Sequence, residues 1–261
     1  MQIGAEIITY LGPVPITNTV TTTILLDIIL IILAIVIRSK LSIIPGIAQG
    51  IFELIHDFVD DLTKNVVKSQ YIKPVFPWIL SFFVIILISN WMGLLPGIET
   101  IYLKKESTNT AISEVKLNDG EAVAESEHIP LFRGANADLN TTLALALVSF
   151  SLVNISAFYF IGIKGWFKHY FHTKPLYLIA LFIFVGLLEI MLDPVKFVSL
   201  ALRLFGNIYA GETLVGVMTT VPGIALPFLL LEVLVGAIQA LIFTGLSLTF
   251  LGVMLSSEEE H

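Results

Sequence analysis

Hydrophobic residues along this chain gather in long runs, and polar residues are concentrated between them. A membrane-spanning helix needs about 20 consecutive, mainly apolar residues, so the pattern predicts several spans. The last run has 32 residues, too many for one perpendicular crossing, and we expect it to tilt strongly, bend or lie partly in the membrane plane. The apolar stretches are 24–37, 75–95, 139–163, 176–191 with a polar-striped continuation over 195–220, and 224–255.

The stretch 43–67 has a different pattern, in which apolar and charged residues occupy opposite faces of a predicted helix. Such a helix lies in the membrane interface rather than crossing the bilayer, and a soluble helical hairpin loop is the alternative. The apolar face comprises Ile47, Ile51, Leu54, Ile55, Phe58 and Leu62, and the charged face comprises Glu53, Asp57, Asp60, Asp61 and Lys64.

Composition agrees with a membrane protein, since 56% of the 261 residues are hydrophobic and only 13% are charged. Soluble proteins are about 25% charged, so a soluble enzyme, a disordered chain and a collagen-like chain are excluded. The absence of cysteine excludes disulfides and cysteine-ligated metals. The net charge of −7 comes without a basic patch, so nucleic acid is not an expected partner. We expect an all-α, polytopic membrane protein with an interfacial amphipathic helix and a long, tilted C-terminal helix hairpin.

Lysine and arginine near span ends predict the orientation, because cytoplasmic loops carry more of them. Segment 38–74 contains five, and segment 164–175 contains three with no acid. The loop 97–138 contains four against eight acids. We expect a single membrane domain over 1–261, with 38–74 and 164–175 cytoplasmic and the acidic loop 97–138 external. The first 18 residues lack lysine and arginine, so we expect no cleaved signal peptide and a permanent first helix.

One face of the predicted helix around 187–218 carries a polar stripe inside an apolar segment. At about 100° per residue, its members lie within roughly 80° of Arg203. Ionisable residues within membrane segments are costly and mark functional sites by default. The stripe comprises Glu189, Asp193, Lys196, Ser199, Arg203 and Asn207.

Arg203 is the only arginine within a predicted span. Its guanidinium stays protonated at any reachable pH. One interpretation is a snorkelling or salt-bridged arginine. The other is a fixed positive charge beside an aqueous path, meeting a carboxylate that this chain does not supply.

Glu212 and Glu232 lie on successive helices, joined by a predicted turn at 221–223. At about 1.5 Å per residue they lie roughly 16 and 14 Å from that turn, hence at similar depth. Two such acids suit a proton relay, with Gln239 donating to and accepting from the same path. The alternative for Glu232 is a neutral carboxyl group in lipid or one hydrogen-bonded to a neighbour.

Other polar residues give weaker signals. Asp138 and Asn140 either line an outer channel or cap the helix that follows. Asn90 and Pro96 end the second predicted span, and we interpret them as a helix stop in which the amide satisfies freed carbonyls. His169 and His172 alone are too few for a metal site, and no glycine-rich phosphate loop occurs, so we expect no metal, no cofactor and no direct nucleotide binding.

The run RLFGNIYAGE at 203–212 resembles the signature of subunit a of the F-type, proton-translocating ATP synthase, in its bacterial form. Further segments agree in order: PITNT at 15–19, NWMGLLPG at 90–97, ADLNTTLALAL at 137–147 and AIQALIFTGLSLTFL at 237–251. The insert at 101–133 looks longer than the family core and is assigned no role.

The resemblance implies roles for seven residues in proton translocation. By it, Arg203 faces the rotor ring, and Glu212 is an acid of one half-channel. Glu232 stands where some members carry histidine and others glutamate. Asn207 and Gln239 match polar residues near the arginine, and Glu189 and Ser199 match polar positions on the arginine helix.

The resemblance also implies a function. The chain would be a membrane stator subunit that is not catalytic on its own and uses the helices of 176–255 to couple proton flow to rotation and ATP synthesis. Its partners would be the rotor ring of subunit c, the peripheral stalk subunit b and membrane lipid, in the bacterial inner membrane. A self-contained ion-coupled secondary transporter and a non-conducting structural subunit are the alternatives. The sequence is compatible with either H⁺ or Na⁺ as the coupling ion, because the carboxylate that binds the ion lies on the partner.

Overall fold

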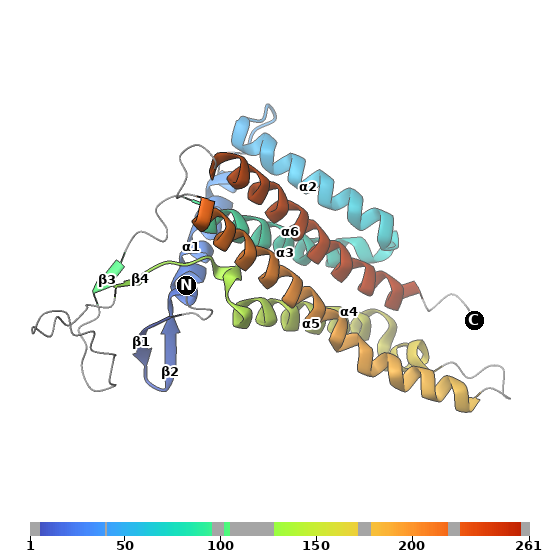
Figure 1. The fold of residues 1–261 in the computed structure, drawn as a ribbon. Helices are drawn as coiled ribbons and strands as arrows, with labels where there is room; N and C mark the ends of the chain where they lie inside the picture. The colour runs from blue at the N-terminus through green and yellow to red at the C-terminus, as the bar shows by residue number, and fades with distance from the viewer. Residues whose placement is uncertain are drawn as a thin grey trace, which may run out of the picture.

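The computed structural model describes residues 6–39, 41–95, 102–104, 128–171, 179–218 and 225–256. Six long helices dominate these ranges (Figure 1). They are α1 (Asn18–Ser39), α2 (Ile47–Val66), α3 (Ser69–Gly93), α4 (Leu139–Tyr170), α5 (Ile179–Met218) and α6 (Ala225–Ser256).

Four of the described helices, α1, α3, α4 and α6, are long and apolar enough to cross a membrane. Helix α5 has 40 residues, but Glu189, Asp193, Lys196, Arg203 and Glu212 interrupt its apolar sequence. The prediction of an all-α, polytopic membrane protein is confirmed.

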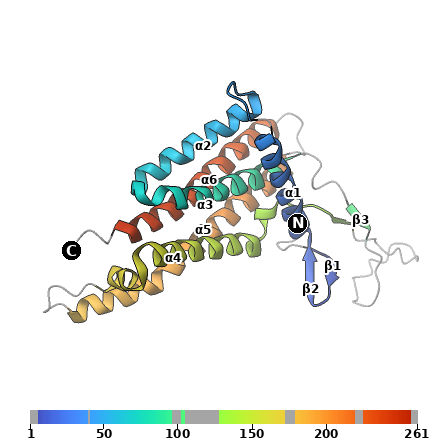
Figure 2. The ribbon, with the colours of Figure 1, turned by 180° about the vertical axis from the view of Figure 1, so that it is seen from behind.

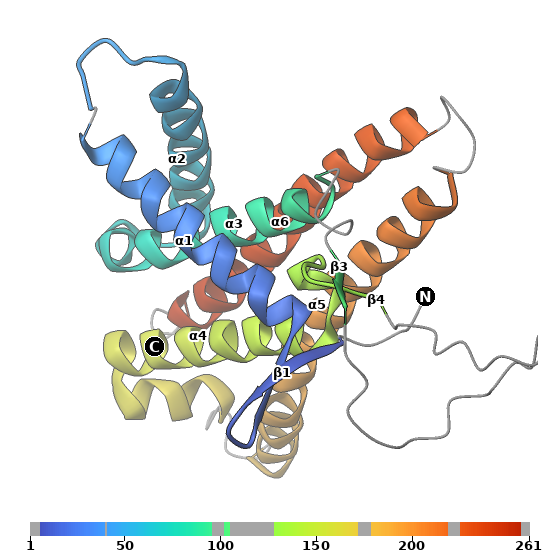
Figure 3. The same ribbon diagram turned by 90° about the vertical axis from the view of Figure 1, so that its left-hand side faces the viewer.

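Helices α3 to α6 pack around a core of aliphatic and aromatic side chains (Figures 1 and 2). Phe82 of α3 stacks on Phe243 of α6 with ring centroids 6.1 Å apart. Ser149 of α4 donates to Ser247 of α6 at 2.8 Å, which satisfies two hydroxyl groups inside the apolar core. Helix α1 crosses α3 instead of joining this bundle lengthwise (Figure 3).

Helix α2 confirms the predicted amphipathic helix, and it packs against α3 and α6 through Val59 and Thr63. Most of its apolar face remains uncovered, with Ile47 88% and Leu54 73% exposed. An exposed apolar stripe is costly in water and favourable at a membrane surface, which supports the interfacial interpretation over a soluble loop.

Several predicted boundaries shift. Helix α3 begins before Pro74 and contains both Pro74 and Pro77, because membrane helices tolerate proline where neighbouring groups satisfy the freed carbonyls. Helix α4 continues past the predicted end, turning at Gly162, whose φ of 69° only glycine adopts easily. Asp27 lies in the middle of α1.

The short strands were not predicted. β1 (Ile7–Leu11) pairs antiparallel with β2 (Val14–Thr17), and β3 (Tyr102–Lys104) pairs antiparallel with β4 (His128–Pro130). A 3-10 turn, η2 (Ala135–Ala137), then leads into α4. The β1–β2 hairpin and the C-terminal end of α6 lie at opposite ends of the molecule (Figures 1 and 2).

Candidate functional site

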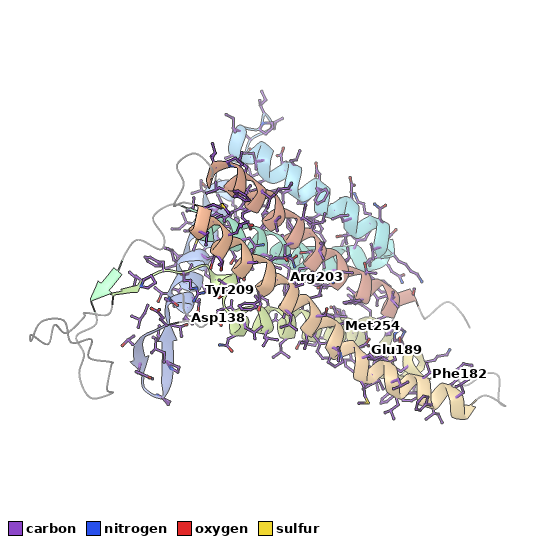
Figure 4. The ribbon with its side chains drawn as sticks, in the orientation of Figure 1. Asp138, Phe182, Glu189, Arg203, Tyr209 and Met254 are labelled. Carbon is purple, nitrogen blue, oxygen red and sulfur yellow. The ribbon has the colours of Figure 1, made fainter. Side chains whose placement is uncertain are left out.

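Arg203 lies on the outward face of α5, between Tyr209 towards one end of the helix and Glu189 towards the other (Figure 4). Leu200, Leu204 and Ile208 form the buried face, and Ser199, Arg203 and Asn207 are exposed on another side. No described carboxylate forms an ion pair with Arg203, so the salt-bridged interpretation finds no support in the described ranges.

Asn207 connects this exposed face to α6. Its Nδ2 donates to Oε1 of Gln239 at 2.8 Å, and Gln239 is only 1% exposed. The Gln239 Nε2 has no hydrogen-bond acceptor among the described residues. A buried amide of this kind is costly unless water or a partner group completes its hydrogen bonds.

Glu232 is buried where α6 packs against α5. Its carboxyl group lies over Gly211, and a Cβ atom at that position would overlap it. Because Gly211 directly precedes Glu212, the two acids lie at neighbouring levels of the hairpin, which agrees with the depth expected from the sequence. The Trp91 indole donates to the carbonyl of Val233 at 3.0 Å and holds this part of α6 against α3.

Glu212 points towards a different part of the protein from Arg203, as its position nine residues further along α5 predicts. Its side chain is 8% exposed, and its Oε2 lies 4.0 Å from Nε of Arg133. Gly93 and Gly134 border the carboxyl group, and Gly134 lies so close that a side chain there would collide with it.

Arg133 is the residue that sequence reasoning missed. It falls at the end of the insert to which no role was assigned, although it is the only arginine of the 97–138 loop. Its backbone N–H donates to the Thr22 hydroxyl at 3.1 Å, which fixes the loop against α1.

Asn90 of α3 forms hydrogen bonds to α6 and to η2 at this end of the site. Its Nδ2 donates to the carbonyl of Gly236 on α6 at 3.0 Å, and its Oδ1 accepts from Nδ2 of Asn136 at 2.7 Å. Asn90 lies in the last turn of α3, which ends at Gly93 as the helix-stop interpretation expects, but its amide satisfies a carbonyl of α6 and a side chain of η2.

Asp138 caps α4. Its Oδ1 accepts from the N–H of Asn140 at 3.0 Å, and its Oδ2 accepts from the Thr19 hydroxyl at 3.0 Å. The capping alternative is confirmed, while Asn140 itself is exposed. An aspartate at this position also interacts favourably with the helix dipole.

A second group of ionisable residues lies at the other end of α5. The Tyr170 hydroxyl donates to Oδ2 of Asp193 at 2.5 Å, and Lys196 Nζ contacts Oδ1 at 2.6 Å. Glu189 and Asp193 line a cavity of about 210 Å³ together with Asn154 and His169.

The predicted pair of His169 and His172 cannot be compared as a pair, because His172 lies outside the described residues. Within those residues, no cluster of three or more potential metal ligands occurs. The turn at 221–223 and most of the 97–138 loop also lie outside the described ranges.

The two acidic groups lie on either side of Arg203 along α5. Glu189 precedes Arg203 by 14 residues and Glu212 follows it by nine. At about 1.5 Å per residue, these separations are roughly 21 Å and 14 Å.

Comparison with known proteins gives a consistent family match. A sequence model described as ATP synthase A chain matches residues 19–252. The chloroplastic ATP synthase subunit a of Stigeoclonium helveticum is 35% identical over 204 residues, which span 76% of this chain and 66% of that protein. The ATP synthase subunit a of Gloeobacter violaceus is 28% identical over 204 residues, 76% of this chain and 67% of that protein. The subunit a of Moorella thermoacetica is 36% identical over 125 residues, 47% of this chain and 54% of that protein.

Proposed function

Because the chain belongs to the ATP synthase A chain family, we propose that it is the membrane stator subunit that couples proton flow to rotation. Two half-channels lead to a rotor ring of helices that carry carboxylates. One half-channel runs past Glu212 and Glu232, and the other past Glu189. Arg203 stands between them, next to the rotor.

The observation that carries this proposal is the placement of Arg203. It is exposed on the outward face of α5 and lies between two separate acidic groups, the buried side chains of Glu212 and Glu232 and the half-buried Glu189 and Asp193. A secondary transporter is expected to hold its ion site between its own helices, near the bilayer midplane. An arginine that faces outward instead supports a mechanism in which a partner protein supplies the carboxylate.

Arg203 acts as a fixed charge in this mechanism. A rotor carboxylate beside it is favoured in its ionised form, and one that moves away takes a proton from the adjacent half-channel. The same charge repels protons that would otherwise pass directly from one half-channel to the other. A proton that crosses a potential of 100 mV releases about 2.3 kcal/mol, which the rotor carries to the site of ATP synthesis.

The α5 and α6 side chains supply the rest of the path. Asn207 lies one turn from Arg203 and donates to Gln239 of α6, whose open Nε2 has hydrogen-bonding capacity for water. Ser199 lies on the exposed side of α5, one turn before Arg203. The partners are the rotor ring of subunit c, the stalk subunit b and lipid, and the location is the bacterial inner membrane. The Arg203→Ala variant of the assembled complex tests the function.

The alternative, a self-contained transporter, makes a different prediction for the isolated chain. A transporter would move ions in vesicles containing this chain alone. The stator requires the rotor ring, so the purified chain alone should show no potential-driven proton uptake, and the chain should copurify with a ring of small hairpin subunits.

Cysteine labelling tests the orientation. A single cysteine at Ser113 should react with an impermeant maleimide added from outside, and one at Lys168 only from the cytoplasmic side. We expect this orientation because acids outnumber bases in 97–138, whereas 164–175 contains only bases, and cytoplasmic loops are enriched in lysine and arginine. The native chain contains no cysteine, so the unmodified chain serves as the control. Labelling at Ser113 only from the cytoplasm would reverse the topology.

Arg133 should assist Glu212 by holding its carboxyl group in place. Arg133→Gln is expected to slow ATP-driven proton pumping by roughly three- to tenfold, within the range of coupling measured between contacting residues. In a Glu212→Gln background, the same change should have no further effect, because its target is already neutral. Arg133→Lys retains the charge and should recover part of the rate. Equal losses in both backgrounds would mean that Arg133 acts only through the fold of the loop.

A further inference from the structure

Asp27 lies halfway along α1 and faces away from the rest of the protein. It follows the first residue of α1 by nine positions, which places it about 14 Å along the helix. Its side chain is exposed and makes no hydrogen bond or ion pair with any described residue. A carboxylate at this depth is costly in hydrocarbon, which offers it neither a counter-charge nor a donor.

Asp27 belongs to a row of exposed residues that recur at alternating steps of four and three. That spacing is the pattern by which one helix packs lengthwise against another. The buried residues of α1, among them Thr22 and Leu26, lie on a different face. The row, called here the outer seam of α1, comprises Val20, Ile24, Asp27, Ile31, Ala34 and Arg38.

A second copy of this chain does not satisfy Asp27. In a parallel pair, the seam would bring two Asp27 carboxylates together, and like charges repel. In an antiparallel pair centred on the seam, Asp27 would lie opposite Ile31, which carries neither charge nor donor. The missing group must come from a different helix.

We propose that the outer seam of α1 packs against a transmembrane helix of another protein, and that a lysine or arginine of that helix pairs with Asp27. The apolar seam residues supply the packing, while the single acid fixes the depth at which the two helices align. The inference depends on α1 being a membrane span and not on the proton path.

Photo-cross-linking in native membranes tests the proposal on the assembled complex. A benzophenone maleimide is attached to a single cysteine at Ile28, which borders the seam at the depth of Asp27. The matched control carries the label at Ile29, at the same depth but about 100° around the helix. Both positions are exposed, at 49% and 41%.

The Ile28 label should form an adduct with an apolar helix that has a lysine or arginine within one turn of the cross-linked residue. The Ile29 label should give little of that adduct. Asp27→Leu should reduce the Ile28 yield by roughly three- to tenfold, in line with polar contacts between membrane helices, and Asp27→Glu should preserve it. Adducts with lipid alone, a partner helix lacking a nearby basic residue, or an unchanged yield in Asp27→Leu would each overturn the proposal.

Discussion

Arg203→Ala should abolish proton-driven ATP synthesis in vesicles while the complex still assembles. Two unit charges about 4 Å apart interact by about 4 kcal/mol at an effective dielectric constant near 20. Losing that interaction shifts the balance between ionised and protonated rotor carboxylate by about a thousandfold. The complex should still assemble, because Arg203 is exposed. The described residues include no ion-pair partner that would lose its counter-charge when Arg203 is removed.

The measurement is ATP synthesis driven by an imposed proton gradient, with subunit content checked on the same vesicles. Leu202→Ala is the matched control, since it shortens an exposed neighbour, 51% accessible, without changing charge. Arg203→Lys should also fail, because an ammonium lacks the planar fork and loses its proton more readily when desolvated. Near-normal coupled synthesis in Arg203→Ala would contradict the stator function.

Glu232→Gln should slow proton translocation by roughly 10- to 100-fold without blocking assembly. Positioned acids and bases contribute about 10²–10⁴-fold to proton transfer, and water with the remaining acid should recover part of this. Glutamine fills the same space over Gly211, so packing is retained while proton exchange is lost. Glu232→His should be tolerated better, because imidazole also takes up and releases protons.

The double variant Glu212→Gln with Glu232→Gln should be slower than either single variant, measured as ATP-driven pumping in inverted vesicles. Glu53→Gln is the control, since it makes the same chemical change on an exposed face of α2. A double variant that pumps at the wild-type rate would remove both acids from the path. That half-channel would then have to be sought around Asp138.

The sequence alone determined the helices, the family resemblance and the placement of residues within one helix. Hydrophobic runs specify membrane helices because each helix satisfies its own backbone hydrogen bonds, so no distant contact is needed. Helical periodicity likewise placed Ser199, Arg203 and Asn207 on one face and Glu212 on another, and the structure agrees. Counting residues from the turn placed Glu212 and Glu232 at matching depth for the same reason.

Only the tertiary structure decided which distant residues meet. The contacts of Arg133 with Glu212, of Asn90 with Gly236 and of Thr19 with Asp138 join residues far apart along the chain. No periodicity within one helix encodes such pairs, because they depend on how loops return to the bundle and which helices become neighbours. The outward position of Asp27 likewise came only from the structure, since exposure is a property of the packed helices.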